Sequence, residues 1–247
     1  AEDTCAIVLA ASRGKELGEL TEQLPKTMVK IQGTPILSHI VDAYNAVGIK
    51  DIVVVRGYKK EAVNLPNLTY VDNNDFADTG ELDSLLKALR SRKGPAQSTI
   101  ISYGDVLFNK YIPQTLCQEN EDCVIFVDSN WQEQSSYARL GGFTECTIPN
   151  SRRAFNAKIY LKQLGDKLPK ESIHGVWMGF LKVSPSATTL ITDIIAELLA
   201  KPANRKATIP HLLQELLKRD YPIRVLYTAG HWLDINSLED VVQAGNF

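Results

Sequence analysis

Two kinds of apolar segment alternate along the first half of the chain. Apolar residues recur at helical spacing over residues 36–47 and 82–89, which predicts an amphipathic helix on each stretch. Short apolar runs that predict buried strands lie on either side of these helices, at residues 7–9, 52–55, 99–103 and 124–127. This order is typical of a Rossmann-like α/β fold, in which a mainly parallel mixed sheet carries helices on both faces.

The second half is less regular, but it continues without a break. Its apolar pattern predicts three more strands and two more helices, at residues 159–161, 176–181, 223–227, 190–199 and 212–217. We find no linker rich in Pro, Gly or Ser and no internal repeat. We therefore expect residues 1–247 to form a single domain.

The loop after the first strand is the first candidate for a binding site, because ligands of open α/β sheets lie beyond the carboxyl ends of the strands. Ala10, Ala11, Ser12 and Gly14 keep the backbone of this loop uncluttered, so that its amides can approach phosphates, and Arg13 adds a cation. The loop matches neither the dinucleotide motif G-x-G-x-x-G nor the P-loop motif. A short polar turn with an exposed arginine is the alternative interpretation.

Three further polar residues occupy positions suited to a phosphate site. Lys26 follows Pro25, which fixes the backbone ahead of it and makes a rigid mount for one ammonium group. Asp105 follows a predicted strand and Asp234 follows the pair Trp232-Leu233, and two such carboxylates suit Mg²⁺ that keeps several waters. Taken singly, each residue has a structural explanation that is at least as good as the functional one: Lys26 as a solvated surface lysine, and each aspartate as the cap of a helix or turn.

Composition excludes several functional classes. The net charge is -2, so the chain has no overall field that would attract nucleic acid or a membrane surface. Cys5, Cys117, Cys123 and Cys146 show no Cys-x-x-Cys spacing, which predicts free thiols and no zinc site. Without a signal peptide pattern or a long apolar run, we expect a cytoplasmic protein.

Together the motifs resemble those of the nucleotidyltransferases that include the sugar-nucleotide enzymes and the phosphocholine cytidylyltransferases. The stretches that carry the resemblance are Leu9 to Gly14, Pro25-Lys26, Gly33-x-Pro35-x-Leu37, Gly104-Asp105 and Trp232-Leu233-Asp234. The resemblance spans nearly the whole chain and implies the GT-A-like nucleotidyltransferase fold. The loop variant A-A-S-R-G is similar to that of cytidylyltransferase domains of phosphonate biosynthesis, which occur alone or fused to phosphoenolpyruvate mutase.

The resemblance also implies roles for individual residues. Lys26 is expected near the α-phosphate of CTP and Arg13 at the β- and γ-phosphates, as the two catalytic cations. Asp105 and Asp234 are expected to hold Mg²⁺, with Asp105 also facing the nucleotide. The remaining expected contacts with the triphosphate and the base are Leu9, Ala10, Ala11, Ser12, Gly14, Gly80 and Ser84.

The implied reaction is Mg²⁺-dependent transfer of a cytidylyl group from CTP to 2-aminoethylphosphonate or 2-hydroxyethylphosphonate. We expect the acceptor to bind mainly within residues 124–185, with Asp128, Trp131 and Trp177 as candidate contacts, although Trp177 lies in an apolar run typical of a core. The alternatives are transfer to phosphocholine or a sugar 1-phosphate, and a catalytically inactive nucleotide-binding regulatory module.

The start of the chain adds one further expectation. It begins with Ala1 rather than methionine, which fits either a removed tag or a cut inside a longer polypeptide. The resemblance favours the second, with this chain as the carboxyl-terminal domain of a protein fused to phosphoenolpyruvate mutase. An oligomer is compatible with this expectation, whereas a nucleic acid or membrane partner is not expected.

Overall fold

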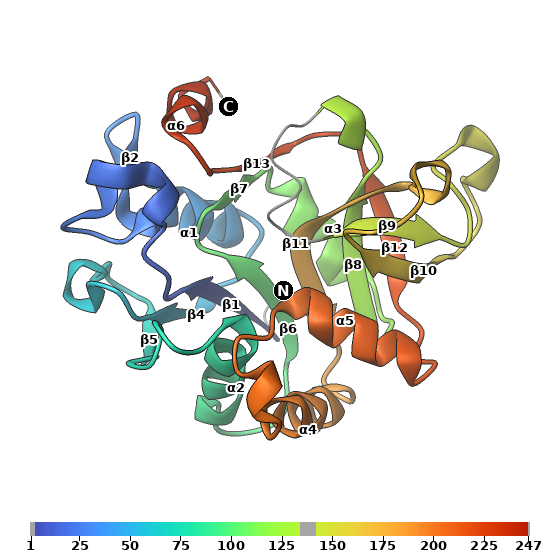
Figure 1. Cartoon of the computed structure of the whole chain (residues 1–247), viewed down its shortest axis with the longest axis horizontal. Coiled ribbons are helices and arrows are strands. Elements are labelled where there is room, and N and C mark those ends of the chain that lie inside the picture. The colour runs from blue at the N-terminus through green and yellow to red at the C-terminus, as the bar shows by residue number, and fades with distance from the viewer. Residues whose placement is uncertain (1–2, 134–141, 247) are drawn as a thin grey trace.

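One mixed sheet of nine strands runs through the part of the chain that this computed structural model describes, residues 3–133 and 142–246 (Figure 1). Its strands, in their order across the sheet, are β5 (Thr69–Asp72), β4 (Asp51–Arg56), β1 (Thr4–Ala10), β6 (Ser98–Tyr103), β11 (Gly175–Val183), β8 (Cys123–Asp128), β12 (Arg224–Thr228), β10 (Ile159–Gly165) and β9 (Phe143–Cys146).

The parallel pairings are concentrated in the first half of this sheet. Strands β5, β4, β1 and β6 run parallel, as the alternation of strands and helices predicts. In the second half only β8 and β12 pair in parallel, and the other pairings are antiparallel. Strands β9 and β10 are joined without an α-helix between them, so the second of the pair returns antiparallel beside the first.

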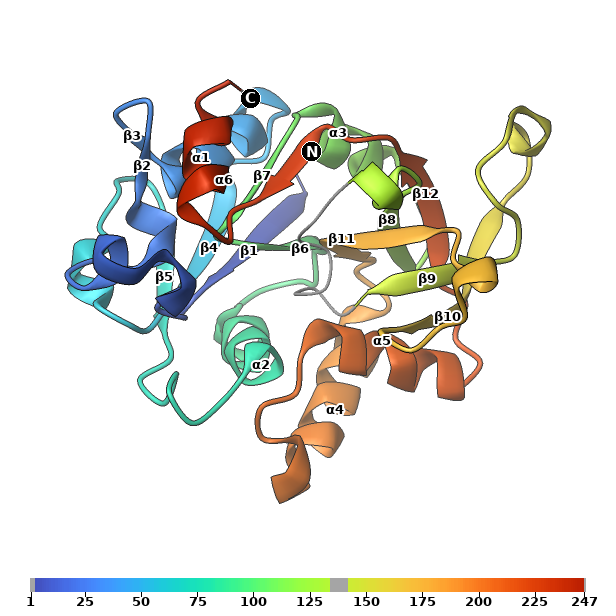
Figure 2. The ribbon, with the colours of Figure 1, turned by 45° about the horizontal axis from the view of Figure 1, so that its top comes forward.

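Helices cover both faces of the sheet, which confirms the predicted fold class. In Figure 2 the sheet separates α1 (Ile36–Ala46) and α3 (Tyr111–Gln118) from a second group of three helices. These are α2 (Glu81–Ser91), α4 (Thr188–Leu199) and α5 (Ile209–Lys218). Within the described ranges, no helix is long and apolar enough to cross a membrane.

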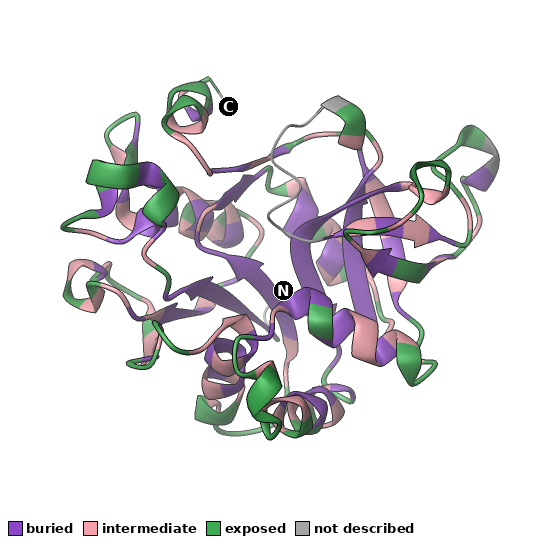
Figure 3. Cartoon of the chain, in the orientation of Figure 1, coloured by how far each residue is buried: buried purple, intermediate pink, exposed green. Residues whose placement is uncertain are grey.

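The central strand β11 is buried along its whole length, and the core lies on both sides of it (Figure 3). It pairs with β6 on one side and with β8 on the other, so it joins the two halves of the sheet. Trp177 in this strand is fully buried, and its indole N–H donates a hydrogen bond to the carbonyl of Phe180 over 2.9 Å.

Several short elements were not predicted, and two of them matter for the site. Strand β7 (Val106–Phe108) pairs antiparallel with β13 (Trp232–Asp234). These two strands lie far apart in the sequence. The helix α6 (Leu238–Ala244) follows β13, and a small ribbon of β2 (Lys30–Ile31) and β3 (Thr34–Pro35) completes the strands. Two short 3₁₀ helices, η1 (Lys15–Thr21) and η2 (Lys26–Met28), lie between β1 and β2.

Candidate active site

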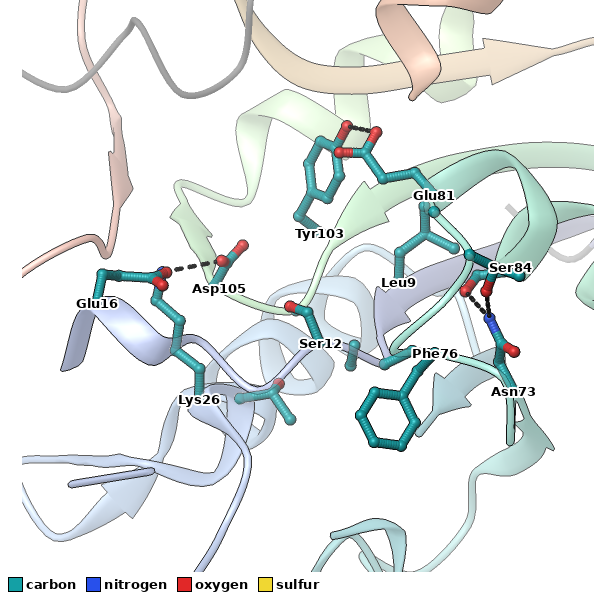
Figure 4. A pocket seen from close by; sticks show the side chains of 16 residues that line it. Leu9, Ser12, Glu16, Lys26, Asn73, Phe76, Glu81, Ser84, Tyr103 and Asp105 are labelled. Atoms are coloured by element: carbon teal, nitrogen blue, oxygen red, sulfur yellow. Dashed lines mark hydrogen bonds and ion pairs between the residues drawn. The ribbon is translucent and has the colours of Figure 1, made fainter. Parts of the chain in front are cut away.

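A cavity of about 270 Å³ opens where the parallel strands β1, β5 and β6 end (Figure 4). Three segments contribute to its lining, within residues 9–27, 73–84 and 103–105. The lining includes most of the predicted nucleotide contacts, namely Leu9, Ala10, Ala11, Ser12, Lys26, Gly80, Ser84 and Asp105. The cavity therefore lies at the edge of the sheet where the sequence predicts a ligand.

Small residues in the first loop allow two strand ends to approach closely. The carbonyl of Leu9 accepts a hydrogen bond from the N–H of Gly104 over 2.8 Å, and that of Ala11 accepts one from Tyr58 over 2.9 Å. A Cβ atom on Gly104 would lie only 2.7 Å from the Cβ of Ala10, so this contact has no room for a side chain. The loop is thus held to its neighbours on both sides.

Lys26 is the fixed cation of the cavity. Its side chain is only 2% exposed, and its Nζ lies 2.6 Å from Glu16 Oε1 and 3.1 Å from Asp105 Oδ2. Pro25 ahead of it is extended, with φ of -72° and ψ of 157°, as the predicted mount requires. Gly14 has φ of 76°, and a Cβ atom there would lie 2.6 Å from the Cβ of Lys26. A glycine at this position therefore leaves the space that the lysine stem occupies.

The pairing of β7 with β13 brings the two predicted metal-binding aspartates together. Asp234 stands opposite Val106 in the register, and the N–H of Ile235 donates to the carbonyl of Asp105 over 3.0 Å. Asp105 lines the cavity, whereas Asp234 is 1% exposed and its Oδ2 accepts from Asn236 Nδ2 over 3.0 Å. The two residues are thus neighbours through the backbone, and carboxylates are the donors through which Mg²⁺ is usually held beside substrate phosphates.

A larger cluster of metal ligands is not found nearby or elsewhere in residues 3–133 and 142–246. No group of three or more His, Cys, Asp and Glu side chains there is arranged to hold a metal ion. A metal at Asp105 and Asp234 would therefore need oxygen atoms of the substrate or of water to complete its coordination.

At the other end of the cavity the uncharged and apolar side chains gather, and the acid beside them, Glu81, is bonded to Tyr103 and to the N–H of Ile209. Asn73, Thr79 and Ser84 supply amide and hydroxyl groups there, while Leu9 and Phe76 supply apolar surface (Figure 4). An apolar surface with a few fixed polar groups is typical of sites that bind a flat heterocycle. The charged and neutral ends thus suit the two parts of a nucleotide.

Gly80 forms the N-cap of α2 at this neutral end. A Cβ atom on it would lie 2.6 Å from the backbone of Lys206, so the close approach of that segment requires a glycine. Gly80 thereby helps to set where α2 begins, and the position of Ser84 in the first turns of the helix follows from it.

Arg13 is not among the residues that line the cavity. Its guanidinium lies over the ring of Tyr58, with the Cζ atom 5.6 Å from the ring centroid, and its buried Nε has no hydrogen-bond partner in the described part of the chain. The predicted contact with the β- and γ-phosphates requires the side chain to turn toward the cavity. That role stays a prediction.

The three predicted acceptor contacts also lie outside the lining. Asp128 is fully buried, and its Oδ2 accepts a hydrogen bond of 2.6 Å from the indole of Trp232. Trp177 packs in the core edge-to-face against Tyr103, with ring centroids 6.0 Å apart, and Trp131 packs against Phe143 at 5.6 Å. The roles of Asp128, Trp131 and Trp177 toward an acceptor stay predictions.

Residues 134–141, within the predicted range 124–185, lie outside the described residues.

Several residues that line the cavity were not among the individual contacts predicted from the sequence. Glu16 contacts Lys26, and Glu81 Oε2 accepts from the Tyr103 hydroxyl over 2.6 Å and from the N–H of Ile209 over 2.8 Å. Asn73 directly follows β5, a strand of four residues with no apolar run. Recognition of that strand would have placed Asn73 at the ligand edge, whereas no spacing signal marks Glu16.

Comparison with known proteins gives this arrangement a family context. The model of the MobA-like NTP transferase domain matches residues 6–170. The chain is 32% identical over 143 residues to the UTP–glucose-1-phosphate uridylyltransferase AglF of Haloferax volcanii, covering 53% of the chain and 57% of AglF. It is 24% identical over 257 residues to the CTP:phosphoglutamine cytidylyltransferase of Campylobacter jejuni, covering 96% of the chain and 97% of that protein.

A third relative matches a shorter stretch. It is the 2-aminoethylphosphonate cytidylyltransferase of Lancefieldella rimae, 31% identical over 94 residues, which are 36% of the chain and 38% of that protein. The chain thus spans nearly all of the Campylobacter relative but much less than two thirds of the Lancefieldella protein.

Solved structures share the fold at low sequence identity. The CTP:phosphocholine cytidylyltransferase LicC of Streptococcus pneumoniae superimposes with a TM-score of 0.71 at 16% identity, covering 99% of the chain and 98% of LicC. The inositol-1-phosphate CTP transferase of T. maritima gives a TM-score of 0.75 at 16% identity, covering 100% of the chain and 96% of that protein. These likenesses confirm the nucleotidyltransferase fold.

Proposed function

We propose, from the premise that this chain belongs to the MobA-like NTP transferase family, that it transfers a cytidylyl group from CTP to a small phosphonate and releases pyrophosphate. The proposed acceptor is 2-aminoethylphosphonate or its hydroxyl analogue, 2-hydroxyethylphosphonate. The observation that carries the proposal is the cavity itself, in which one buried ammonium faces a neutral, partly apolar end.

The choice of a phosphonate rests on the first loop and on one relative. The loop reads Ala10-Ala11-Ser12-Arg13-Gly14, the variant that resembles phosphonate cytidylyltransferases, and it lies against the cavity. The similarity to the 2-aminoethylphosphonate cytidylyltransferase of Lancefieldella rimae supports the same acceptor class.

The proposed reaction needs no covalent intermediate with the protein. A phosphonate oxygen forms a bond to the α-phosphorus of CTP, while the bond from that phosphorus to the bridging oxygen breaks and its electron pair leaves with pyrophosphate. The phosphonate oxygen is already ionised near neutral pH, so no proton has to be removed from it. Positioning and fixed charge can therefore carry the reaction.

Lys26 is the proposed source of that fixed charge. Its ammonium is held by Glu16 and Asp105 in a site from which water is largely excluded, because the side chain is only 2% exposed. A preorganised cation in such a place stabilises the negative charge that builds on the α-phosphate oxygens as the phosphorus becomes five-coordinate. Arg13 is proposed to contact the β- and γ-phosphates after its guanidinium leaves Tyr58.

Asp105 and Asp234 are proposed to hold Mg²⁺, because the pairing of β7 with β13 brings their backbones side by side and carboxylates are the donor type that this ion prefers. When bound, the ion supplies positive charge that neutralises phosphate oxygens. Asp105 shares its carboxylate with Lys26 in the present arrangement, so the proposed metal and the lysine draw on the same side chain.

A second candidate acceptor is a phosphate compound instead of a phosphonate. The similarity to the CTP:phosphoglutamine cytidylyltransferase extends over 96% of the chain, which favours CTP as donor but a different acceptor. Phosphocholine and sugar 1-phosphates belong to this second class.

One experiment separates these acceptors. Pyrophosphate release is measured with CTP, UTP, ATP and GTP, each crossed with 2-aminoethylphosphonate, 2-hydroxyethylphosphonate, phosphoglutamine, phosphocholine and glucose 1-phosphate. We expect the highest kcat/KM with CTP and one of the phosphonates. Faster turnover with any phosphate compound than with both phosphonates would contradict the proposed acceptor.

The same protein could instead be a nucleotide-binding regulatory module, and calorimetry tests this alternative. A regulatory module binds CTP without releasing pyrophosphate in the presence of any acceptor of the panel. Lys26 and Asp105 line one end of the cavity and Asp234 lies on the strand paired beside Asp105, which argues for turnover, since binding of a base does not need all three.

A further inference from the structure

Asn73 holds its side-chain amide in one orientation at the neutral end of the cavity. It is 1% exposed, and its backbone N–H donates to the carbonyl of Arg56 over 2.7 Å. Its Oδ1 accepts a hydrogen bond from the N–H of Asp75 over 3.1 Å. Because a backbone N–H can only donate, the atom that faces it must be the carbonyl oxygen, and the amide nitrogen must point the other way.

The amide nitrogen of Asn73 donates to two hydroxyl groups. Its Nδ2 lies 3.1 Å from Thr79 Oγ1 and 2.9 Å from Ser84 Oγ. Thr79 in turn donates its own hydrogen to the carbonyl of Asp75 over 2.8 Å. Every polar atom of the Asn73 side chain is therefore engaged, and the direction of each bond is set by the Asp75 backbone.

Ser84 is left as a donor toward the cavity. A free serine hydroxyl rotates and can either donate to a ligand or accept from it. Here one lone pair receives the Asn73 hydrogen, and in the parts of the chain that are described this is the one hydrogen bond of the Ser84 side chain. Ser84 is 4% exposed and lines the cavity, so its hydroxyl hydrogen is available to a bound ligand (Figure 4).

We propose that Asn73 fixes the Ser84 hydroxyl as a hydrogen-bond donor to N3 of the pyrimidine ring, and thereby selects cytidine over uridine nucleotides. The inference rests on the proposed function, in which CTP is the donor substrate. Cytosine has an acceptor at N3, whereas uracil carries a hydrogen there. The O2 atom is an acceptor in both bases, so N3 is the acceptor position at which a donor can discriminate between them.

The Asn73 amide strengthens this discrimination. For uracil to fit, the Ser84 hydroxyl would have to turn and accept from N3–H, and its own hydrogen would then need another acceptor. The Asn73 nitrogen cannot accept that hydrogen, because an amide nitrogen only donates. Uridine binding would therefore require the Ser84 hydrogen to turn to another acceptor, such as the Gly80 carbonyl one turn earlier, and a site that must rearrange its polar groups binds a close analogue more weakly.

The test reverses the polarity at Asn73 while keeping its size. In Asn73→Asp the carboxylate accepts the Ser84 hydrogen, so that the hydroxyl presents a lone pair to the cavity. Dissociation constants for CTP and UTP are measured by calorimetry with Mg²⁺ and without any acceptor. We expect the preference for CTP over UTP to fall by roughly tenfold or more, on the scale of one hydrogen bond in a buried site.

A matched control adds the same charge one residue away. Asn74 is exposed, does not line the cavity, and its Oδ1 accepts from Lys60 Nζ over 2.9 Å. The variant Asn74→Asp is expected to keep the parent ratio of the two dissociation constants. Near-ultraviolet circular dichroism establishes that both variants are folded.

Ser84→Ala provides a second measurement that does not depend on a buried charge. It removes only the hydroxyl and is expected to lower the preference for CTP as well. In the double variant Asn73→Asp/Ser84→Ala, the aspartate is expected to change the ratio no further. A ratio shift of equal size with and without the Ser84 hydroxyl would overturn the proposal, because the effect would not pass through that group.

The remaining outcomes separate this inference from the proposed function. An unchanged ratio in folded Asn73→Asp, or a stronger preference for CTP, overturns the inference even when phosphonates support turnover. Preferential binding of CTP through Ser84 without turnover on any phosphonate supports the inference and contradicts the proposed acceptor.

Discussion

Lys26 supplies a buried positive charge to the candidate site. Burial of an ammonium costs free energy unless it is paired, and the carboxylates of Glu16 and Asp105 supply the pairing. The stem of the lysine packs beside Gly14, so its position is fixed by packing as well as by charge. A cation held in this way is already placed when a phosphate arrives.

Replacement of Lys26 by alanine is expected to lower kcat by roughly 10²-fold or more, the scale of losing one preorganised electrostatic contact. Lys30→Ala is the matched control, because Lys30 is an exposed lysine on the adjacent strand β2. Steady-state pyrophosphate release measures both variants, with CTP and the acceptor each varied. A folded Lys26→Ala protein with the parent kcat would remove Lys26 from the mechanism.

The two aspartates give a separate prediction at the same scale. Asp105→Asn and Asp234→Asn each keep the size of the side chain but remove a negative ligand, so we expect both to abolish most turnover while the fold is retained. Chelation of the parent protein with EDTA should have the same effect, and added Mg²⁺ should reverse it. Asp83→Asn, which alters only a surface pair with Lys87, is the control.

Parent-level turnover in the presence of excess EDTA is the result that contradicts the proposed metal site. Normal turnover in one aspartate variant alone would remove that residue from the site and leave the other in place.

At the scale of elements, the turn between β1 and η1 positions the lysine. Gly14 and Gly33 have nearly the same left-handed backbone, with φ of 76° and 78°, but a Cβ atom meets Lys26 only at Gly14 and meets nothing within 4 Å at Gly33. We expect both Gly→Ala variants to lose about 1–3 kcal/mol of unfolding free energy through backbone strain. Only Gly14→Ala is expected to lower kcat as well.

Urea unfolding and pyrophosphate release test the two effects separately. Equal loss of kcat in Gly14→Ala and Gly33→Ala would contradict the role of Gly14 in placing Lys26, because the strain is matched between them.

The long elements could be predicted from the sequence, whereas the short ones that build the site could not. Strands such as β1 and β8 carry apolar runs because they are buried on both faces, and α1 carries a clear helical period. Strand β5 has no such run, and β7 and β13 are each three residues long with partners distant in the chain. Their pairing brings the backbone of Asp105 beside that of Asp234. Before the structure, only the resemblance to known enzymes indicated that these two residues act together.

The directions of individual side chains were the second feature that could not be predicted from the sequence. The sequence predicted Arg13 in the loop after the first strand, but nothing in the residue pattern indicated that its guanidinium lies over Tyr58. For Asp128, the partner is Trp232 at the start of β13, a strand that had not been predicted. Such contacts depend on tertiary packing, which periodicity does not encode.

At the scale of the whole molecule, the reactivity of the cysteine thiols can show which parts of the sheet are buried. Within the described ranges all four are free thiols, and only Cys117 is partly exposed. Burial raises the pKa of Cys5 and of Cys123 to about 12, and it raises the pKa of Cys146 as well. Thiolate is the reactive form, so these three are expected to be inert in the folded protein.

We therefore expect one fast-reacting thiol in native protein treated with a thiol reagent near neutral pH, and four after denaturation. Cys117→Ser should abolish the fast reaction. Two or more fast thiols in the folded parent would contradict the burial of the sheet.

The same thiols test whether the chain unfolds as a single unit, which is the expectation for one domain. Cys5 lies on β1 in the parallel half, and Cys146 lies on β9 at the far edge of the other half. Strand β11 pairs with β6, β8 and β9, so both halves lose its hydrogen bonds and its buried surface if it is released. In a Cys117→Ser background we expect Cys5 and Cys146 to become reactive over the same range of urea concentration. Exposure of Cys146 at clearly lower urea than Cys5 would show that the second half opens independently, and the single domain would then have to be divided at β11.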